Sequence, residues 1–232
     1  MYELFIGNKN YSSWSLRPWV LLRAHGVDFV EHVMPFKPGS SWQEFRAFSP
    51  TGKVPCLRSG ATVVWDSLGI AEYLAERHEG LWPGDKAARA WARCATAEMH
   101  SGFAALRHHC GMNVGLRVRL REWPEALLAD VRRIDELWNE GLARFGGPFL
   151  AGEWFTIVDA FYCPVAYRVR TYEIPLTGAA AAYAQRLLEL PAMRDWETAA
   201  LAEPWRDPAH EDEIAALGAI IADLRVPPGA GT

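Results

Sequence analysis

The chain has 232 residues, of which 50% are hydrophobic and 22% are charged, and its 24 basic and 28 acidic residues give a net charge of −4 at pH 7. This is the composition of a globular protein with enough apolar surface for one large domain or two small ones. Its mild acidity argues against a binder of nucleic acid or anionic membranes, which works through clustered Lys and Arg. The one basic cluster, Arg117, Arg119 and Arg121, is interpreted as a solvated helix face.

Residues 1–80 alternate short β-rich runs with helical patterns. In chain order we expect a strand over 1–6, a helix over 14–24, a strand over 29–34, a short helix over 42–48, two strands over 54–58 and 62–65 joined by a hairpin turn, and a helix over 67–77. The first strand, helix and strand require a right-handed crossover and a parallel pair, whereas the hairpin is antiparallel. The predicted order of this α/β domain is therefore βαβ, helix, ββα.

The run Leu81-Trp82-Pro83-Gly84-Asp85 breaks every periodic pattern, so we place a linker at 81–86. The remaining patterns are helical, with one long helix over 87–110, a helix between Pro124 and Gly146, and helices over 156–170, 179–190 and 191–202. Residues 203–232 are rich in proline and contain one weak helix over 211–224. We therefore predict an all-helical domain over 87–232.

The cysteines Cys56, Cys94, Cys110 and Cys163 lack the CxxC spacing of a zinc ribbon or a dithiol redox motif, which favours a reducing compartment. The N-terminus lacks the basic start and the cleavage site of a signal peptide, and no apolar run approaches the length of a membrane span. We therefore expect a cytoplasmic location and no contact with a membrane. His108 and His109 are adjacent and point in different directions on a helix, so we expect no metal site.

The turn between the first strand and the first helix carries several hydroxyl groups, in the run Asn10-Tyr11-Ser12-Ser13-Trp14-Ser15-Leu16-Arg17-Pro18. The free N–H groups and the positive dipole end of a helix suit an anion or a thiolate at this place. Simple capping of the helix by Ser12, Ser13 or Ser15 is the structural alternative.

Two dipeptides further along the chain also suit a ligand. A cis bond at Val54-Pro55 would turn the backbone of Val54 toward a ligand, and an ordinary trans proline at a sheet edge is the alternative. At Asp66-Ser67, between a strand and a helix, Asp66 can meet an ammonium group, while Ser67 and the helix N–H groups can hold a carboxylate. Capping of the helix is again the alternative.

Thr156 and Asp159 have the spacing of a capping box at the start of a later helix. We interpret this pair as structural.

Together and in this order, these features resemble the cytosolic glutathione transferases over nearly the whole chain, and among them the serine-type classes such as zeta, tau and theta. The runs that carry the resemblance are Ser12-Ser13-Trp14-Ser15-Leu16-Arg17, Ser49-Pro50-Thr51-Gly52-Lys53-Val54-Pro55, Asp66-Ser67 leading into Ile70-Ala71-Glu72-Tyr73-Leu74, and Thr156-Ile157-Val158-Asp159.

The resemblance implies a thioredoxin-like N-terminal domain that binds glutathione, an all-α C-terminal domain that holds the acceptor site, and a homodimer. The implied activity is that of a glutathione S-transferase, which activates the thiolate of its cosubstrate glutathione for attack on a small electrophile and so transfers an alkyl or aryl group, without a metal. The residue implied to hydrogen-bond the sulfur is Ser12, with Ser13 as the next choice.

The implied glutathione-binding residues are Arg17, Lys53, Val54, Pro55, Asp66 and Ser67. The cis-proline of the family falls on Pro55, so that the backbone of Val54 would pair with the cysteinyl part of glutathione. Asp66 and Ser67 would hold the γ-glutamyl head. Lys37, Trp42 and Lys53 are candidates for the carboxylate at the glycine end.

Two departures from the zeta class concern its specific chemistry. Trp14 stands where that class has cysteine, which argues against maleylacetoacetate isomerase activity. Ser101-Gly102 matches the class, but Ala104 replaces a glutamine and His108 replaces an asparagine. On a continuous helix His108 shares a face with Ala104 and Ser101, so we assign it to the acceptor site; a buried structural histidine is the alternative.

The alternatives to a transferase are a glutathione-dependent isomerase or redox enzyme and a non-enzymatic binding protein. Glutathione-dependent reductases of this architecture usually carry a cysteine in the first turn, where this chain has only serines. A pure binder would be free to lose Ser12 and Asp66, which are both present.

Overall fold

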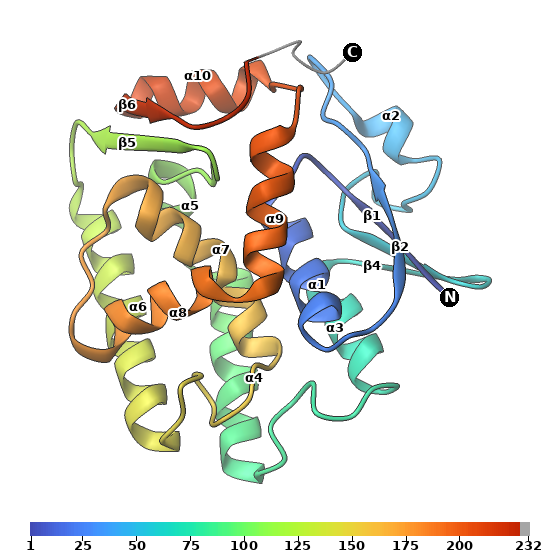
Figure 1. The fold of residues 1–232 in the computed structure, drawn as a ribbon, viewed down its shortest axis with the longest axis vertical. Helices are drawn as coiled ribbons and strands as arrows, with labels where there is room; N and C mark the ends of the chain where they lie inside the picture. The colour runs from blue at the N-terminus through green and yellow to red at the C-terminus, as the bar shows by residue number, and fades with distance from the viewer. Residues whose placement is uncertain (228–232) are drawn as a thin grey trace.

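The computed structural model describes residues 1–227, and its N-terminal part is a four-stranded sheet with three helices. Figure 1 shows this part beside the helices of the rest of the chain. The elements are β1 (Tyr2–Ile6), α1 (Ser13–Ala24), β2 (Phe29–Val33), α2 (Trp42–Phe45), β3 (Cys56–Ser59), β4 (Thr62–Trp65) and α3 (Ser67–Ala75). The strand order is β2-β1-β3-β4, in which β1 and β2 are parallel and the other pairs are antiparallel. The predicted order βαβ, helix, ββα is therefore confirmed.

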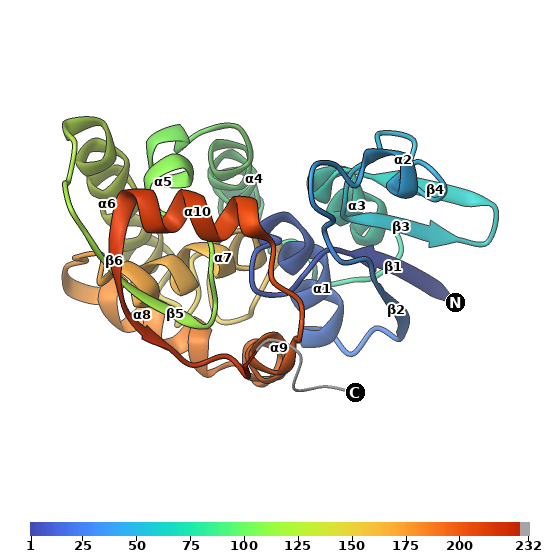
Figure 2. The same cartoon turned by 90° about the horizontal axis from the view of Figure 1, so that it is seen from above.

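The side chains of β1 point alternately into two hydrophobic clusters, so both faces of the sheet are covered. Leu4 and Ile6 are fully buried in the main hydrophobic core, which also contains residues of α1 and α3. Phe5, between them, joins a smaller cluster around Phe45 and Phe48 instead. Because successive side chains of a strand point to opposite faces, α1 and α3 pack on one face and the α2 region packs on the other. Helix α1 thus lies between the sheet and the helical part (Figure 2).

The second part of the chain is built around one buried helix. Its elements are α4 (Lys86–Ser101), α5 (Ala104–His109), β5 (Leu116–Leu120), α6 (Glu125–Phe145), α7 (Ile157–Tyr172), α8 (Gly178–Glu189), α9 (Pro191–Ala202), α10 (Pro208–Leu217) and β6 (Gly218–Asp223). Helix α7 is almost entirely buried and packs against α1, α4 and α8. The predicted fold class, a thioredoxin-like α/β domain followed by a helical region, is confirmed. The domain limits and the linker at 81–86 stay predictions.

The predicted capping box at the start of α7 is confirmed. Asp159 accepts hydrogen bonds from the backbone N–H and the hydroxyl of Thr156, at 2.9 and 3.2 Å. No helix within residues 1–227 is both long and apolar enough to cross a membrane.

The single helix predicted over 87–110 is wrong, because the chain bends between α4 and α5. Gly102 ends α4 with its N–H on the carbonyl of Glu98, and a Cβ atom at Gly102 would lie 2.7 Å from that same oxygen. Phe103 then takes a left-handed φ of 57° before α5 begins. The close approach at Gly102 requires glycine, so this residue permits the bend.

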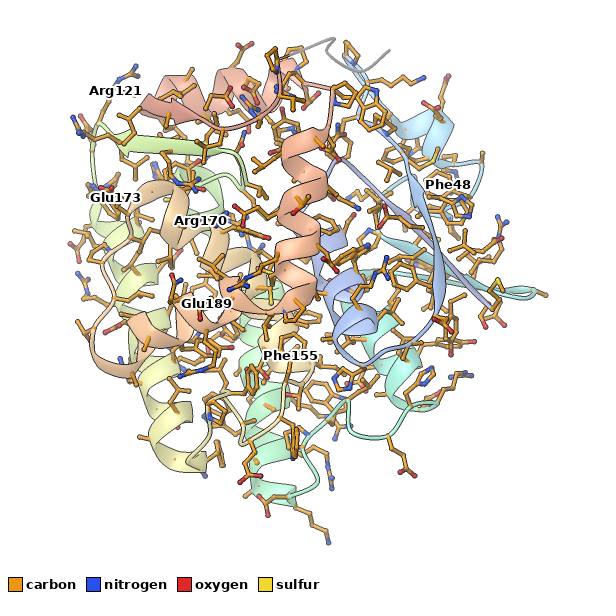
Figure 3. All side chains as sticks on the ribbon, in the orientation of Figure 1. Phe48, Arg121, Phe155, Arg170, Glu173 and Glu189 are labelled. Atoms are coloured by element: carbon orange, nitrogen blue, oxygen red, sulfur yellow. The ribbon has the colours of Figure 1, made fainter. Side chains whose placement is uncertain are left out.

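The prediction that the C-terminal part is all helical is also wrong, because β5 pairs antiparallel with β6 beside α10 (Figure 1). The weak helix predicted over 211–224 is therefore α10 followed by a strand. Arg117, Arg119 and Arg121 lie on β5 or just after it and form no helix face. Buried leucine and valine alternate with these arginines along β5, as a strand requires. Arg121 donates to the carbonyl of Ala215 in α10 (Figure 3).

Arg225, just after β6, fixes the C-terminal segment of α10 and β6 to the rest of the molecule. Its guanidinium donates to Glu211 of α10 (2.9 Å), to Asp223 (2.7 Å) and to the hydroxyl of Tyr11 (3.2 Å). Burial raises the pKa of Glu211, but the hydrogen bonds from Arg225 and Tyr11 outweigh burial and hold the pKa below its usual value. The hydrogen bonds from Arg225 also lower the pKa of Asp223.

We predict that Arg225→Met lowers the free energy of unfolding by about 3 kcal/mol at pH 7, because it leaves a partly buried carboxylate without its cation. A carboxylate with a lowered pKa stabilises the fold above its unfolded-state pKa, and this contribution is lost as the pH falls through the folded-state value. The difference between wild type and variant should therefore shrink below pH 4.5, the ordinary value for Glu211. Urea denaturation at several pH values measures both effects.

The matched control is Arg132→Met, which removes an exposed ion pair with Glu125. It should change the free energy of unfolding by less than about 0.5 kcal/mol. Equal effects of the two substitutions would contradict the role given to Arg225.

Candidate functional site

Two adjoining cavities of about 660 and 460 Å³ share part of their lining, and the larger one lies between the sheet domain and the helical part. The larger cavity is lined by the turn before α1, the loop before α2, and parts of α5, α7 and α10. The smaller one is lined by the loop before β3 and the start of α3. Trp14, Lys53 and Val54 line both cavities, so one extended ligand can occupy the two together.

The serine turn reaches the larger cavity. Ser12 and Ser13 line it and are each 6% exposed. The hydroxyl of Ser12 donates to Oγ of Ser15 at 2.7 Å, and Ser15 also accepts the N–H of Gly7 at 3.1 Å. Ser12 occupies the N-cap position of α1, but its side chain makes no capping hydrogen bond. The capping alternative therefore does not hold for Ser12.

The conformation of this turn is held from the far end of the chain. The carboxylate of Glu203, just after α9, accepts the backbone N–H groups of Lys9 (2.6 Å) and Asn10 (3.3 Å). The side chain of Asn10 donates to the carbonyl of Ala200 at 2.5 Å, and the indole of Trp196 donates to the carbonyl of Lys9 at 2.9 Å. Burial raises the pKa of Glu203 despite these hydrogen bonds. The turn that carries Ser12 is thus bound to α9, which lies beside α1 (Figure 1).

The Val54-Pro55 peptide bond is cis. Of the two possibilities that the sequence left open, a cis bond and an ordinary trans proline, the structure therefore has the first. Val54 and Lys53 line both cavities, and Pro55 lines the smaller one. Gly52 precedes them at φ 63°, and a Cβ atom there would lie 2.6 Å from the ring of Trp42. This glycine therefore lets Trp42 pack against the loop.

The three candidates for a terminal carboxylate, Lys37, Trp42 and Lys53, all line the larger cavity. Lys37 is exposed and pairs with Glu44 at 3.2 Å.

Asp66 both caps a helix and faces a cavity. Its Oδ1 accepts the N–H groups of Leu68 (2.7 Å) and Gly69 (3.3 Å), so the capping alternative is realised. Its Oδ2 lies 3.4 Å from Nε2 of His100 on α4, and Asp66 and Ser67 line the smaller cavity. Asp66 has a φ of 68°, and such strain in a residue other than glycine is concentrated at functional sites.

Arg17 lies behind the cavities and lines neither. It is fully buried, donates to Oγ of Ser67 at 3.3 Å, and its guanidinium lies 4.1 Å from the ring centre of Trp14. Burial lowers its pKa well below the usual value, and the neighbouring Arg107 and Arg168 lower it further. Arg17 therefore contacts Ser67 and Trp14 from the protein interior and holds both side chains in position.

The structure does not bring His108 to either cavity. His108 is exposed on α5, because the bend at Gly102 removes the one-turn relation to Ser101 on which the prediction depended. The neighbouring Arg107 lines the larger cavity instead.

Sequence reasoning missed Arg107, Arg168 and His210, which all line the larger cavity. Arg168 is a charged residue in the middle of a buried apolar helix, and this pattern was a usable signal. His210 lies on α10, hydrogen-bonds Asp207 through Nδ1, and stacks on Tyr11 with 5.1 Å between ring centres. Within residues 1–227, no group of three or more His, Cys, Asp and Glu side chains is arranged to hold a metal ion.

The comparisons with known proteins agree with this arrangement. Residues 11–77 match the family model described as glutathione S-transferase, N-terminal domain, and this segment contains the serine turn, Val54-Pro55 and Asp66-Ser67.

Three curated relatives share parts of the sequence. The chain is 41% identical over 56 residues to dichloromethane dehalogenase from Methylorubrum extorquens, a match that covers 23% of this chain and 19% of that protein. It is 24% identical to the glutathione S-transferase-like protein OpS6 from Beauveria bassiana, over 70% of this chain and 76% of the relative. It is 26% identical to glutathione S-transferase L3 from Arabidopsis thaliana, over 67% of this chain and 62% of the relative. The matches thus cover less than two thirds of two of these relatives.

Solved structures resemble most of the chain, including its helical part. A theta class glutathione S-transferase from Xanthomonas axonopodis with glutathione bound has a TM-score of 0.61 at 24% identity, over 84% of this chain and 95% of that one. A tau class glutathione S-transferase from mango, Mangifera indica, has a TM-score of 0.66 at 19% identity, over 93% and 96% of the two chains. Residues 11–77 therefore match the N-terminal domain of the glutathione S-transferases, and the chain has the fold of the solved glutathione S-transferases.

Proposed function

We propose that the protein is a glutathione S-transferase that activates the thiolate of glutathione for attack on a small electrophile. One observation carries this proposal: the serine turn, Val54 and the Asp66-Ser67 pair come from three separate segments and line two adjoining cavities. The match over residues 11–77 to the N-terminal domain of this family supports it.

In this proposal glutathione spans both cavities. Oδ2 of Asp66 meets the ammonium of the γ-glutamyl head, and Ser67 with the N–H groups of α3 holds its carboxylate. The backbone of Val54 pairs with the cysteinyl part as an added strand would. The glycine end then reaches the larger cavity near Lys37, Trp42 and Lys53, and the cysteinyl sulfur lies near the serine turn.

The chemistry needs no nucleophile from the protein, because the sulfur of glutathione attacks. A free thiol with a pKa near 8.5 is about 3% ionised at pH 7, and lowering the pKa by roughly 1.5 units raises this to about half. That shift corresponds to about 2 kcal/mol of differential stabilisation, which one hydroxyl donor and the N-terminus of α1 together can supply.

We assign the sulfur donor to Ser12. Its hydroxyl and that of Ser15 are 2.7 Å apart, and either hydroxyl of such a pair can donate. Ser15 accepts the N–H of Gly7, so it can donate to Ser12 when glutathione binds and leave the proton of Ser12 for the sulfur. A chain of hydrogen bonds oriented in this way strengthens its last member.

Ser12→Ala should raise the pKa of the bound thiol by about one unit or more, since a charge-assisted hydrogen bond is worth roughly 1.5 to 3 kcal/mol. The affinity for glutathione should change little, and kcat/KM should fall and partly recover at high pH, where thiolate forms unaided. Ultraviolet absorbance of the bound thiolate as a function of pH measures the pKa directly.

Ser13→Ala is the matched control and should raise the pKa of the bound thiol less. If Ser13→Ala loses the thiolate and Ser12→Ala keeps it, the donor is Ser13; if neither moves the pKa, activation by serine is wrong.

Asp66→Asn should weaken glutathione binding by roughly 1.5 to 3 kcal/mol, the range for hydrogen bonds to charged groups. Asparagine keeps an oxygen that can cap α3, so the loss should come from the ligand contact and not from unfolding. Calorimetry measures the affinity, and circular dichroism checks the helix. If the affinity for glutathione is unchanged and the structure is intact, Asp66 acts only as a helix cap.

The transferase is favoured over the redox alternative by the residues at the site. Neither cavity lining within residues 1–227 includes a cysteine, and the first turn of α1 presents serines to the larger cavity.

We further propose a homodimer, as the resemblance to the family implies. Trp154 and Trp205 are large exposed aromatic side chains that line neither cavity, and surfaces of this kind are often covered by a partner. Sedimentation should give twice the mass of 26.0 kDa at micromolar concentration, and a monomer there would contradict this part of the proposal.

A further inference from the structure

Three guanidinium groups gather at the inner side of the larger cavity. Arg17 comes from α1, Arg107 from α5 and Arg168 from α7. Arg107 and Arg168 lower the pKa of Arg17, and Arg107 also lowers the pKa of Arg168. The ring of Trp14 lies between two of them, with Arg17 at 4.1 Å and Arg107 at 4.7 Å from its centre. Arg107 and Arg168 line the cavity itself.

Arg168 lacks a partner for its charge. It is 3% exposed, and its Nε donates to the carbonyl of Cys110 at 2.8 Å. Its Nη1 is buried and has no hydrogen-bond partner within residues 1–227. Burial and the nearby Arg107 lower the pKa of Arg168 to about 10, and no carboxylate offsets them. The thiol of Cys110 is neutral, because burial raises its pKa to about 12.

The acidic side chains of the cavity do not supply the missing charge. Asp207 is hydrogen-bonded to His210, and Glu213 is exposed on α10. Asp66 and Asp130 act on the pKa values of Arg17 and Arg107, and neither is among the groups that act on Arg168. A buried charge without a partner is costly, so proteins rarely keep one unless a ligand or partner compensates it.

We propose that the larger cavity binds an electrophile that carries a carboxylate, and that Arg168 and Arg107 bind this carboxylate. Guanidinium groups suit this partner because their planar N–H groups match the two oxygens of a carboxylate. Ser12 and Ser13 line the same cavity, so the bound carboxylate would anchor the electrophile beside the sulfur of glutathione. This inference rests on the proposed transferase function and specifies the class of its second substrate.

A matched pair of probes tests the carboxylate alone: 4-chloro-3-nitrobenzoate and its neutral isostere 4-chloro-3-nitrobenzamide. In both, the thiolate of glutathione forms a bond to the ring carbon, the C–Cl bond breaks with its electron pair, and chloride leaves. The products are the thioether and chloride, and no oxidant or reductant is needed. The amide group activates the ring toward substitution more strongly than the carboxylate does, so the two probes differ in reactivity even without the enzyme. The comparison therefore uses the ratio of the two kcat/KM values in each variant.

Arg168→Gln should lower the benzoate-to-benzamide ratio of kcat/KM about tenfold or more relative to wild type, mainly through the KM for the benzoate. Arg107→Gln should lower the same ratio, and Arg168→Lys should restore part of it. The matched control is Arg170→Gln, two residues further along α7 (Figure 3), because Arg170 is paired with Glu197 at 2.8 Å and lines neither cavity. It should leave the ratio unchanged.

Binding without turnover keeps this test separate from that of the transferase. Calorimetry with the unreactive 3-nitrobenzoate should show binding to wild type that Arg168→Gln weakens about tenfold. With 3-nitrobenzamide the substitution should have no comparable effect.

If glutathione is conjugated but the ratio and the benzoate affinity are the same in wild type and Arg168→Gln, the inference is overturned and the transferase stands. If Arg168→Gln instead loses affinity for glutathione, the arginine belongs to the tripeptide and the inference is also overturned. If neither probe is conjugated and glutathione does not bind, the transferase fails, and benzoate binding alone decides whether the arginines hold an anion.

Discussion

The buried carboxylate of Glu203 is the contact on which the rest of the site depends. It accepts the backbone N–H groups of Lys9 and Asn10, in the turn that leads from β1 to Ser12. Burying a carboxylate is costly unless N–H donors satisfy it, and the raised pKa of Glu203 reflects that cost. The position of the serine hydroxyls is therefore set by a residue more than 190 positions away, and it requires the C-terminal helices to be folded.

Helix α7 links this turn to the wall of the larger cavity that carries Arg168. It packs against α1 through the core, and three of its side chains donate to carbonyls of the segment after α5: Arg168 to Cys110, Thr171 to Asn113 and Tyr172 to Gly111. The wall of the larger cavity is thus fixed to the most buried helix of the molecule. A rigid wall of this kind can hold an unpaired guanidinium in place until an anion arrives.

Much of the fold could be predicted because it follows from local patterns. The strand over 1–6, the helix between Pro124 and Gly146 and the capping box of Thr156 and Asp159 each follow from patterns along the chain, and all three agree with the structure. Errors occurred where a distant contact decided the outcome. Leu116-Arg117-Val118-Arg119-Leu120 has the alternation of a strand, but its partner β6 lies about a hundred residues later in the chain. The prediction for His108 failed for a different, local reason: a single glycine such as Gly102 inside a helical pattern is compatible with both a straight helix and a break.

The sequence by itself determined the order of the elements in residues 1–80 and the serine turn before α1, and it marked the Val54-Pro55 and Asp66-Ser67 pairs as candidate places for a ligand. These depend on backbone propensity and on neighbours along the chain, which a sequence contains directly. Only the tertiary structure decided that Ser12 contacts Ser15 instead of capping the helix, that Arg17 lies beneath Trp14, and that Arg107 and not His108 reaches the cavity. It alone revealed the unpaired charge of Arg168, because whether a charge is buried and whether a partner lies nearby depend on contacts between residues far apart in the chain.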